Sequence, residues 1–177
     1  MSLIRRAKTD PMAFAKLYEE HVQAVYHYLI VRIQNQKEAE DLTSNVWENV
    51  LRNIKNLNSN NTTVFRAWLF TITRNCFNKF LSEKIKNKKV DFEEESEKFM
   101  CEDPLPQEIL KEKENASQIH VLINALPEEQ RETLTLRYFS DLRNKEIAKI
   151  LTVSEKTVAS NLYRALQTLR DLWGKLQ

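Results

Sequence analysis

Gly174 is the only glycine in this chain of 177 residues, and the chain has only four prolines. Two-residue β-hairpin turns depend on glycine because they place residues at positive φ. An extensive sheet would need several such turns, so the sequence predicts an all-α fold. At this length the chain can form one domain or two small ones, each with a modest core.

Cysteine and histidine are few and scattered, at Cys76, Cys101, His21, His27 and His120. Neither a disulfide framework nor a zinc site has this pattern, so we expect no metal and no cofactor. No apolar run approaches the roughly 20 residues of a membrane span, and the N-terminus has no signal-peptide core. We therefore expect a cytoplasmic protein without membrane insertion.

Charge divides the chain into three blocks. Residues 1–90 carry 15 basic and 8 acidic residues, residues 91–114 carry 3 and 10, and residues 115–177 carry 9 and 7. The acidic stretch begins at Asp91 and continues through Pro104 and Pro106, which is typical of a linker. It is either a solvated spacer or a strand that mimics nucleic acid and covers a basic surface, in this chain or in a partner.

Apolar residues recur at helical spacing through most of residues 1–90. Asp10 and Pro11 form a good helix start, and apolar residues then recur at helical spacing to about Arg32. A second helix is predicted from about 37 to 56, followed by a polar loop over 57–63. A long helix is predicted from 64 to about 86. It interleaves aromatic and basic side chains, as single-stranded nucleic acid binding requires, although most of its aromatic residues share one face and should be core.

Residues 145–162 contain two short helical periods joined by a tight turn, which predicts a helix-turn-helix. Val153 could fill the corner, and Ser154 could cap the second helix. The apolar residues that would join the two helices are Ile147, Ala148, Leu151, Val158 and Leu162. The second helix leaves a short polar set outward that suits base edges and phosphates, whereas the alternative is an ordinary helical hairpin with a solvated face.

Four ordered segments resemble the extracytoplasmic-function (ECF) sigma factors, the smallest type in the sigma-70 family of bacterial RNA polymerase. The segments are Glu38–Thr43 (EAEDLT), Phe65–Asn75 (FRAWLFTITRN), Leu126–Glu132 (LPEEQRE) and the helix-turn-helix. The resemblance covers nearly the whole chain. It implies a sigma-2 domain at 1–90, an acidic linker at 91–111 and a sigma-4 domain at 112–177. It also implies a transcription initiation factor rather than an enzyme.

The resemblance implies three sets of site residues. Polymerase binding would involve Asp41, Leu42, Asn45 and Val46. The −10 element, melted with a base flipped out, would be held by Leu57, Asn58, Arg74, Asn75, Asn78 and Lys79. The −35 element, read as duplex, would be contacted by Lys145, Lys156, Ser160, Asn161 and Arg164. The implied partners are core RNA polymerase, through the clamp coiled coil of its largest subunit and the beta flap, and promoter DNA, with an anti-sigma factor as a further candidate.

The chain departs from the family pattern near its helix-turn-helix. Asp141 and Arg143 stand where Gly and Ser are common, so the usual capping box with Glu146 is expected to be absent. Thr152 stands where Gly is common in the turn. Ala159 and Asn161 replace frequent cations, which predicts weaker phosphate attraction or a different promoter preference.

Two other functions compete with the sigma-factor interpretation. A free-standing helix-turn-helix regulator would normally dimerise, and no separate dimerisation segment is visible. An enzyme with a nucleic-acid-binding tail would need a catalytic motif. A chain with one glycine has no phosphate-cradling loop, and the sequence shows no nucleophile and base set.

Overall fold

The computed structural model describes residues 2–88 and 121–174. Throughout these ranges every regular element is a helix, which confirms the all-α prediction. The predicted linker at 91–111, with its acidic run and Cys101, lies outside the described residues. The expectation that this acidic stretch covers a basic surface therefore stays a prediction.

The first two helices are α1 (Leu3–Ala7) and α2 (Pro11–Ile33). The predicted start of α2 is confirmed, because the Asp10 carboxylate accepts a hydrogen bond of 2.9 Å from the backbone N–H of Met12. Pro11 occupies the first helical position, where its missing N–H costs nothing. The helix ends at Gln34, which takes a left-handed conformation with φ of 58°.

Helix α3 (Gln36–Asn53) begins after Asn35, whose side chain accepts a hydrogen bond of 2.9 Å from the backbone N–H of Glu38. The α-helix is shorter than predicted. Residues Ile54–Asn56 form a tighter 3-10 turn, η1, which turns the chain so that Ile54 is buried with 1% of its surface exposed.

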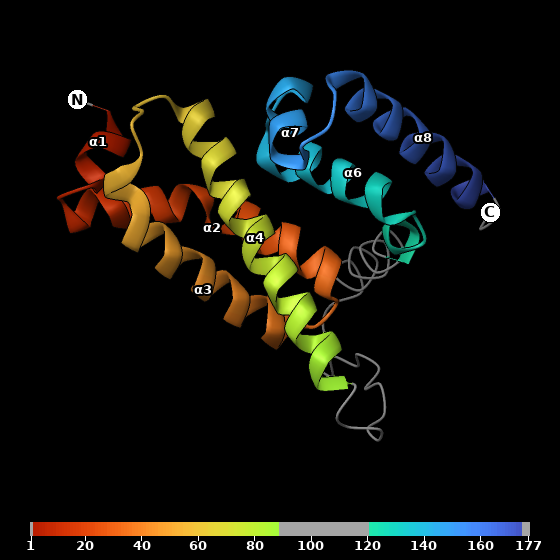
Figure 1. Ribbon diagram of the computed structural model, residues 1–177, viewed down its shortest axis with the longest axis horizontal. Helices are drawn as coiled ribbons and strands as arrows, with labels where there is room; N and C mark the ends of the chain where they lie inside the picture. Colours follow the sequence, from red (N-terminus) through yellow and green to blue (C-terminus); the bar gives the residue numbers. More distant parts are fainter. Residues whose placement is uncertain (1, 89–120, 175–177) are drawn as a thin grey trace, which may run out of the picture.

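Helix α4 (Thr62–Lys88) begins two residues before its predicted start. The Asn61 side chain accepts hydrogen bonds from the N–H groups of Thr63 and Val64, at 2.8 and 3.2 Å. The aromatic core prediction is confirmed for Phe65, Phe70 and Phe77, which are 2% exposed or less. These residues point in more than one direction because α4 lies between α3 and the helices of the C-terminal half (Figure 1).

The C-terminal half contains α6 (Glu128–Ser140), α7 (Asn144–Leu151) and α8 (Glu155–Gly174), preceded by helical residues at 121–124. The helix-turn-helix is confirmed in α7 and α8. Ser154 caps α8 as predicted, since its Oγ accepts a hydrogen bond of 3.0 Å from the N–H of Thr157. The corner prediction was wrong: Val153 is 40% exposed, and Ile150 and Val158 are buried in the core instead. The turn residue Thr152 has φ of 58°.

The two helical halves pack against each other through α2 and α4 on one side and α6 and α7 on the other (Figure 1). One cluster of buried residues includes side chains from both halves, such as Phe65 and Leu136. The rings of His27 and Phe139 also meet across the boundary, with centroids 5.8 Å apart. The predicted domains therefore form a continuous packed unit within the described residues.

Candidate nucleic-acid interface

The exposed side of α8 carries three of the predicted −35 residues. Lys156 and Arg164 are exposed, and Ser160 is half-buried. Neither cation forms an ion pair with any part of the chain that the structure describes. Tyr163, which the sequence analysis missed, is 66% exposed next to Arg164. Its place outside the apolar stripe of α8 is the signal that could have identified it.

Asn161 is not available as a base reader, which corrects the sequence prediction. Only 9% of its surface is exposed, and it follows the helical period of Val158 and Ala165, both fully buried. Positions three and seven residues apart lie on one side of a helix, so Asn161 faces the rest of the domain. The replacement of a frequent cation at this position therefore removes no charge from the outward face.

Lys145 is exposed near the start of α7, where it was predicted to contact phosphate. The capping expectation at this helix was partly wrong. The backbone N–H of Arg143 donates a hydrogen bond of 3.2 Å to the Glu146 carboxylate. Glu146 thus satisfies the backbone at the helix start without the usual serine.

Helix α4 separates its predicted −10 residues between two sides. Asn75, Asn78 and Lys79 are exposed, and Lys79 has only a loose ion pair of 3.8 Å with Glu83. Arg74 points elsewhere, because its Nε donates a hydrogen bond of 2.8 Å to Oε1 of Glu132 on α6. The amide side chains and Lys79 can therefore reach a ligand that Arg74 cannot reach in this arrangement.

The loop before α4 begins with a buried residue, and the residue after it is exposed. Leu57 is only 8% exposed, so its side chain belongs to the core rather than to a DNA contact. Its backbone oxygen accepts a hydrogen bond of 2.5 Å from Nζ of Lys8, just beyond α1. Asn58 is exposed and can reach a ligand. Of the two predicted loop residues, only Asn58 has an accessible side chain.

A cluster of arginines and carboxylates joins the two halves and was not predicted. The Arg32 side chain, 2% exposed, forms ion pairs with Glu128 and with Glu132, the latter at 3.2 Å. Its guanidinium also donates to the Tyr28 hydroxyl at 2.6 Å and lies 4.2 Å from the centre of the Phe77 ring. Glu132 thus accepts from both Arg32 and Arg74. This cluster connects α2, α4 and α6.

Burial and charge act together on the groups of this cluster. Burial raises the pKa of the Tyr28 hydroxyl to about 12. Burial by itself would lower the pKa of Arg32, but the Coulombic effects of Tyr28, Glu128 and Glu132 outweigh it, and the pKa is raised. The arginine therefore stays charged although it is buried, and a buried charge has to be paired.

The predicted polymerase-binding residues lie on two sides of α3. Asp41 and Asn45 are exposed, whereas Leu42 is 8% exposed and Val46 is fully buried. Val46 therefore packs in the core and is not available to a partner, and Leu42 is not an exposed anchor. Asp41, Leu42 and Asn45 line a shallow groove of about 270 Å³, whose opposite wall on α4 includes Lys79.

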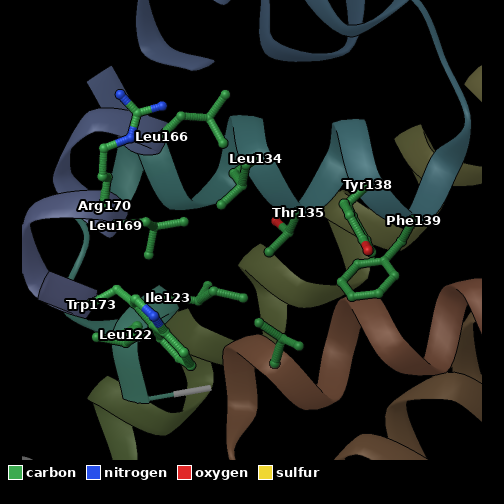
Figure 2. A pocket seen from close by; sticks show the side chains of 11 residues that line it. Leu122, Ile123, Leu134, Thr135, Tyr138, Phe139, Leu166, Leu169, Arg170 and Trp173 are labelled. Carbon is green, nitrogen blue, oxygen red and sulfur yellow. The ribbon is translucent and has the colours of Figure 1, made fainter. Parts of the chain in front are cut away.

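An apolar cleft lies mainly on the C-terminal half and has a volume of about 610 Å³. Figure 2 shows side chains from residues 121–124, α6 and α8 around this cleft, and Val31 of α2 completes the lining. Its most exposed apolar members are Tyr138 at 80%, Leu166 at 58% and Trp173 at 40%. A concave surface of this kind suits an amphipathic helix from a partner.

No group of His, Cys, Asp and Glu suited to a metal ion occurs within 2–88 and 121–174. Across the same ranges, no helix is long and apolar enough to cross a membrane. Cys76 is a free thiol that lines the same groove as Lys79, and burial raises its pKa.

Two family models match the chain: sigma-70 region 2 over residues 17–84 and sigma-70 region 4 over residues 116–169. The chain is 29% identical over 160 residues to the ECF RNA polymerase sigma factor SigE of Mycolicibacterium smegmatis, covering 90% of this chain. It is 30% identical over 176 residues to the ECF RNA polymerase sigma factor BldN of Streptomyces coelicolor, covering 97% of this chain. The chain spans 61% and 65% of the lengths of these two relatives. This chain belongs to the ECF group of the sigma-70 family.

Solved structures share the fold. A structure of CnrH in complex with the cytosolic domain of CnrY is similar with a TM-score of 0.73 at 18% identity, covering 98% of this chain and 96% of that one. The sigma factor RpoE of Bartonella quintana, solved with the anti-sigma factor NepR, is similar with a TM-score of 0.68 at 21% identity, covering 91% and 96%. At these identities the likeness concerns the arrangement of helices.

Proposed function

We propose that this chain is a transcription initiation factor that binds core bacterial RNA polymerase and directs it to promoters. The observation that carries the proposal is the combination, in one chain, of a helix-turn-helix with exposed cations and a second helix with exposed amide side chains. Both features lie in segments that match sigma-70 regions 2 and 4. In this role the chain binds and positions, and the polymerase performs the chemistry.

The −35 element would be read as duplex by the start of α8. Lys156, Ser160 and Arg164 lie on the accessible side of the helix, and Lys145 lies at the neighbouring start of α7. Lys and Arg can contact guanine edges or phosphates in a major groove. The exposed ring of Tyr163 adds an apolar contact to this face, for example with a thymine methyl group.

The −10 element would be held as single strand between the loop after Leu57 and the outward side of α4. Asn58, Asn75 and Asn78 each offer an amide that can donate to and accept from a base edge. Lys79 supplies charge for the backbone. Arg74 belongs to this set only after its carboxylate partner on α6 has moved away.

Polymerase docking would use two separate surfaces. The groove between α3 and α4, with Asp41, Leu42 and Asn45, is proposed to meet the clamp coiled coil of the largest subunit. The apolar cleft with Tyr138, Leu166 and Trp173 is proposed to meet the beta flap, because a concave apolar surface on a helical domain accepts a partner helix. An anti-sigma factor is a further proposed partner, supported by the complex of RpoE from B. quintana with the anti-sigma factor NepR.

The docking proposal is tested by Asp41→Arg with core polymerase and run-off transcription on candidate promoters. The side chain of Asp41 is exposed, so the variant should keep its helical content while transcription is abolished. Glu19→Arg is the matched control, because Glu19 is an exposed acid on α2 outside the groove. Wild-type affinity of Asp41→Arg for core polymerase would contradict the assignment.

The same assay separates the sigma-factor proposal from a free-standing regulator. A sigma factor is retained by core polymerase and supports specific initiation. A regulator instead binds a palindromic duplex as a tight homodimer without polymerase. The domain boundaries at 1–90, 91–111 and 112–177 remain part of the proposal.

A further inference from the structure

Lys8 lies just after α1 and reaches the loop before α4, which begins 49 positions further along the chain. Its Nζ donates a hydrogen bond of 2.5 Å to the backbone oxygen of Leu57, and the contact is partly buried. Leu57 immediately precedes the proposed −10 loop, which we define as residues 58–61. A side chain from the N-terminal end of the fold thus holds the start of this loop.

The backbone oxygen of Leu57 needs this partner because of the way the chain leaves the 3-10 turn. Leu57 has extended backbone angles, with φ of −71° and ψ of 107°, and is 8% exposed. Its N–H still donates a hydrogen bond of 3.2 Å to the oxygen of Ile54, whereas its own oxygen lies beyond the helical turn. A buried carbonyl without a donor costs free energy. The ammonium of Lys8 supplies the donor, and a charged donor forms the stronger bond.

The backbone of Lys8 is itself held in place. Ile4 and Ala7 of α1 are 3% and 4% exposed and belong to the hydrophobic core cluster. The N–H of Asp10 donates a hydrogen bond of 2.9 Å to the oxygen of Arg6, and the side chains of these two residues form an ion pair of 3.2 Å. Lys8 therefore lies in an anchored turn, and only its side chain has to be ordered to reach the loop.

A separate set of hydrogen bonds holds the far end of the −10 loop. The Asn61 side chain caps the start of α4, and the N–H of Asn61 donates a hydrogen bond of 3.1 Å to Oγ of Ser59. Between the two ends, Asn58 and Asn60 are exposed. The loop is thus held at both ends and accessible in the middle, so the direction of its amide side chains depends on both anchors.

We propose that Lys8 is a positioning residue for −10 recognition. Through the Leu57 oxygen it sets the conformation of residues 58–61, so that the Asn58 amide is presented to a base of the single strand. This inference rests on the proposed function for the role of the loop. A base-reading amide discriminates between bases when its direction is fixed before binding, because no ordering cost is then paid on contact. Lys8 contributes without touching DNA, since its ammonium is bound to the backbone.

A direct contact between Lys8 and a DNA phosphate is the competing explanation. The two roles differ in their dependence on salt. Loss of one phosphate contact to single-stranded DNA reduces the slope of log affinity against log salt by about 0.7. Loss of a positioning lysine leaves that slope unchanged and reduces the discrimination between sequences.

The test uses holoenzyme formed from the full chain and core polymerase. Lys8→Met removes the donor at similar side-chain length, and Lys8→Arg retains a charged donor. Lys55→Met is the matched control, because Lys55 is an exposed lysine of η1, two residues before Leu57. Wild-type holoenzyme first enriches a sequence from a pool of randomised single-stranded oligonucleotides. Fluorescence anisotropy over a series of salt concentrations then compares the enriched oligonucleotide with a scrambled version for each variant.

Amide hydrogen exchange of the free chain adds a measurement that involves no DNA. We expect Lys8→Met to exchange about tenfold faster at residues 57–61, with wild-type rates in α2 and α6. In the holoenzyme, its preference for the enriched sequence should fall about tenfold, the size of one base-reading contact, at an unchanged salt slope. Lys8→Arg should restore most of both properties, and Lys55→Met should match the wild type.

Wild-type exchange at residues 57–61 in Lys8→Met would overturn the inference, and so would faster exchange with an unchanged sequence preference. A reduced salt slope would show a direct phosphate contact and would overturn it as well. If Lys8→Met loses protection throughout the chain, Lys8→Ala, which introduces no apolar chain end, replaces it under the same criteria.

Failure of the inference can be distinguished from failure of the proposed function. If wild-type holoenzyme enriches no sequence, the proposed −10 role of the loop is wrong and the inference falls with it. If wild-type and Lys8→Met holoenzymes prefer the enriched sequence equally, only the inference is wrong.

Discussion

The two proposed DNA-reading helices differ in the state of their cations. On α8, Lys156 and Arg164 are exposed, with no ion pair inside the described residues. On α4, Arg66 and Arg74 are both paired with carboxylates of the C-terminal half. The proposed duplex-reading surface is therefore open in the free chain, whereas Arg74 of the proposed surface for melted DNA is covered.

This difference suggests an order of events. A helix with unpaired cations can meet duplex DNA at once, and its affinity should depend strongly on salt. A helix whose cations are already paired has to exchange one anionic ligand for another. We therefore expect duplex contact at the proposed −35 surface to precede contact at the proposed −10 surface.

The largest effect is expected for Arg32→Ala, which removes the centre of the cluster of arginines and carboxylates that joins the two halves. The side chain is 2% exposed, and its loss leaves the buried Tyr28 hydroxyl without its hydrogen-bond partner. We expect the free energy of unfolding to fall by about 3 kcal/mol, as for other broken buried ion pairs. Urea denaturation measures this change.

Arg52→Ala is the control for Arg32→Ala. Its ion pair with Glu48 is exposed, with side chains 71% and 63% accessible, so its loss should cost less than about 0.5 kcal/mol. Equal losses for the two variants would show that the cluster is no more than a surface contact.

The second-largest effect is expected for the exposed cations of α8. Lys156→Ala combined with Arg164→Ala should weaken binding of the free chain to duplex promoter DNA about thirtyfold and make the affinity less dependent on salt. Lys16→Ala, at an exposed lysine of α2 far from α8 in sequence, is the matched control. Titration of labelled duplex over a series of salt concentrations measures both quantities. If the salt dependence of the affinity is unchanged, the DNA phosphates contact other residues than Lys156 and Arg164.

A smaller effect is expected at the exposed side of α4. Asn75→Ala should reduce open-complex formation with core polymerase about tenfold, the loss typical of one base-reading amide, and leave closed-complex binding unchanged. Permanganate reactivity reports the melted bases, and footprinting reports the closed complex. If closed-complex binding falls instead, the roles of α4 and α8 have been exchanged.

Local signals in the sequence were sufficient for most of the fold. The start of α2 at Asp10 and Pro11, the cap of α8 at Ser154 and the apolar periods of both halves depend on neighbouring residues only. The end of α3 was placed too late because a 3-10 turn continues the same residue pattern with a different geometry.

The candidate sites were harder to predict because family positions and helical period disagreed. Val46 was assigned to polymerase from the resemblance, yet its helical period places it among buried residues, and the structure agrees with the period. Asn161 was placed on the outward side because its side chain is polar, whereas its spacing from Val158 and Ala165 puts it on the buried side. Leu57 was assigned to DNA although a leucine after a helix is more often buried. The cluster of arginines and carboxylates between the halves could not be foreseen, because Arg32 and Glu132 are a hundred positions apart and meet only through packing.

The smallest effect is expected at two residues with a left-handed backbone conformation, each of which ends one helix, one in each half. Thr152 and Gln34 both have φ of 58°, but only threonine is branched at Cβ, which makes this conformation more costly. Glycine removes that cost and adds freedom to the unfolded chain, so the two effects partly cancel. Thr152→Gly should therefore raise the free energy of unfolding by about 1 kcal/mol, and Gln34→Gly by about half as much. Thermal denaturation of both variants measures the difference. An equal gain in the two halves would show that the branched side chain stores no strain at the turn that orients α8.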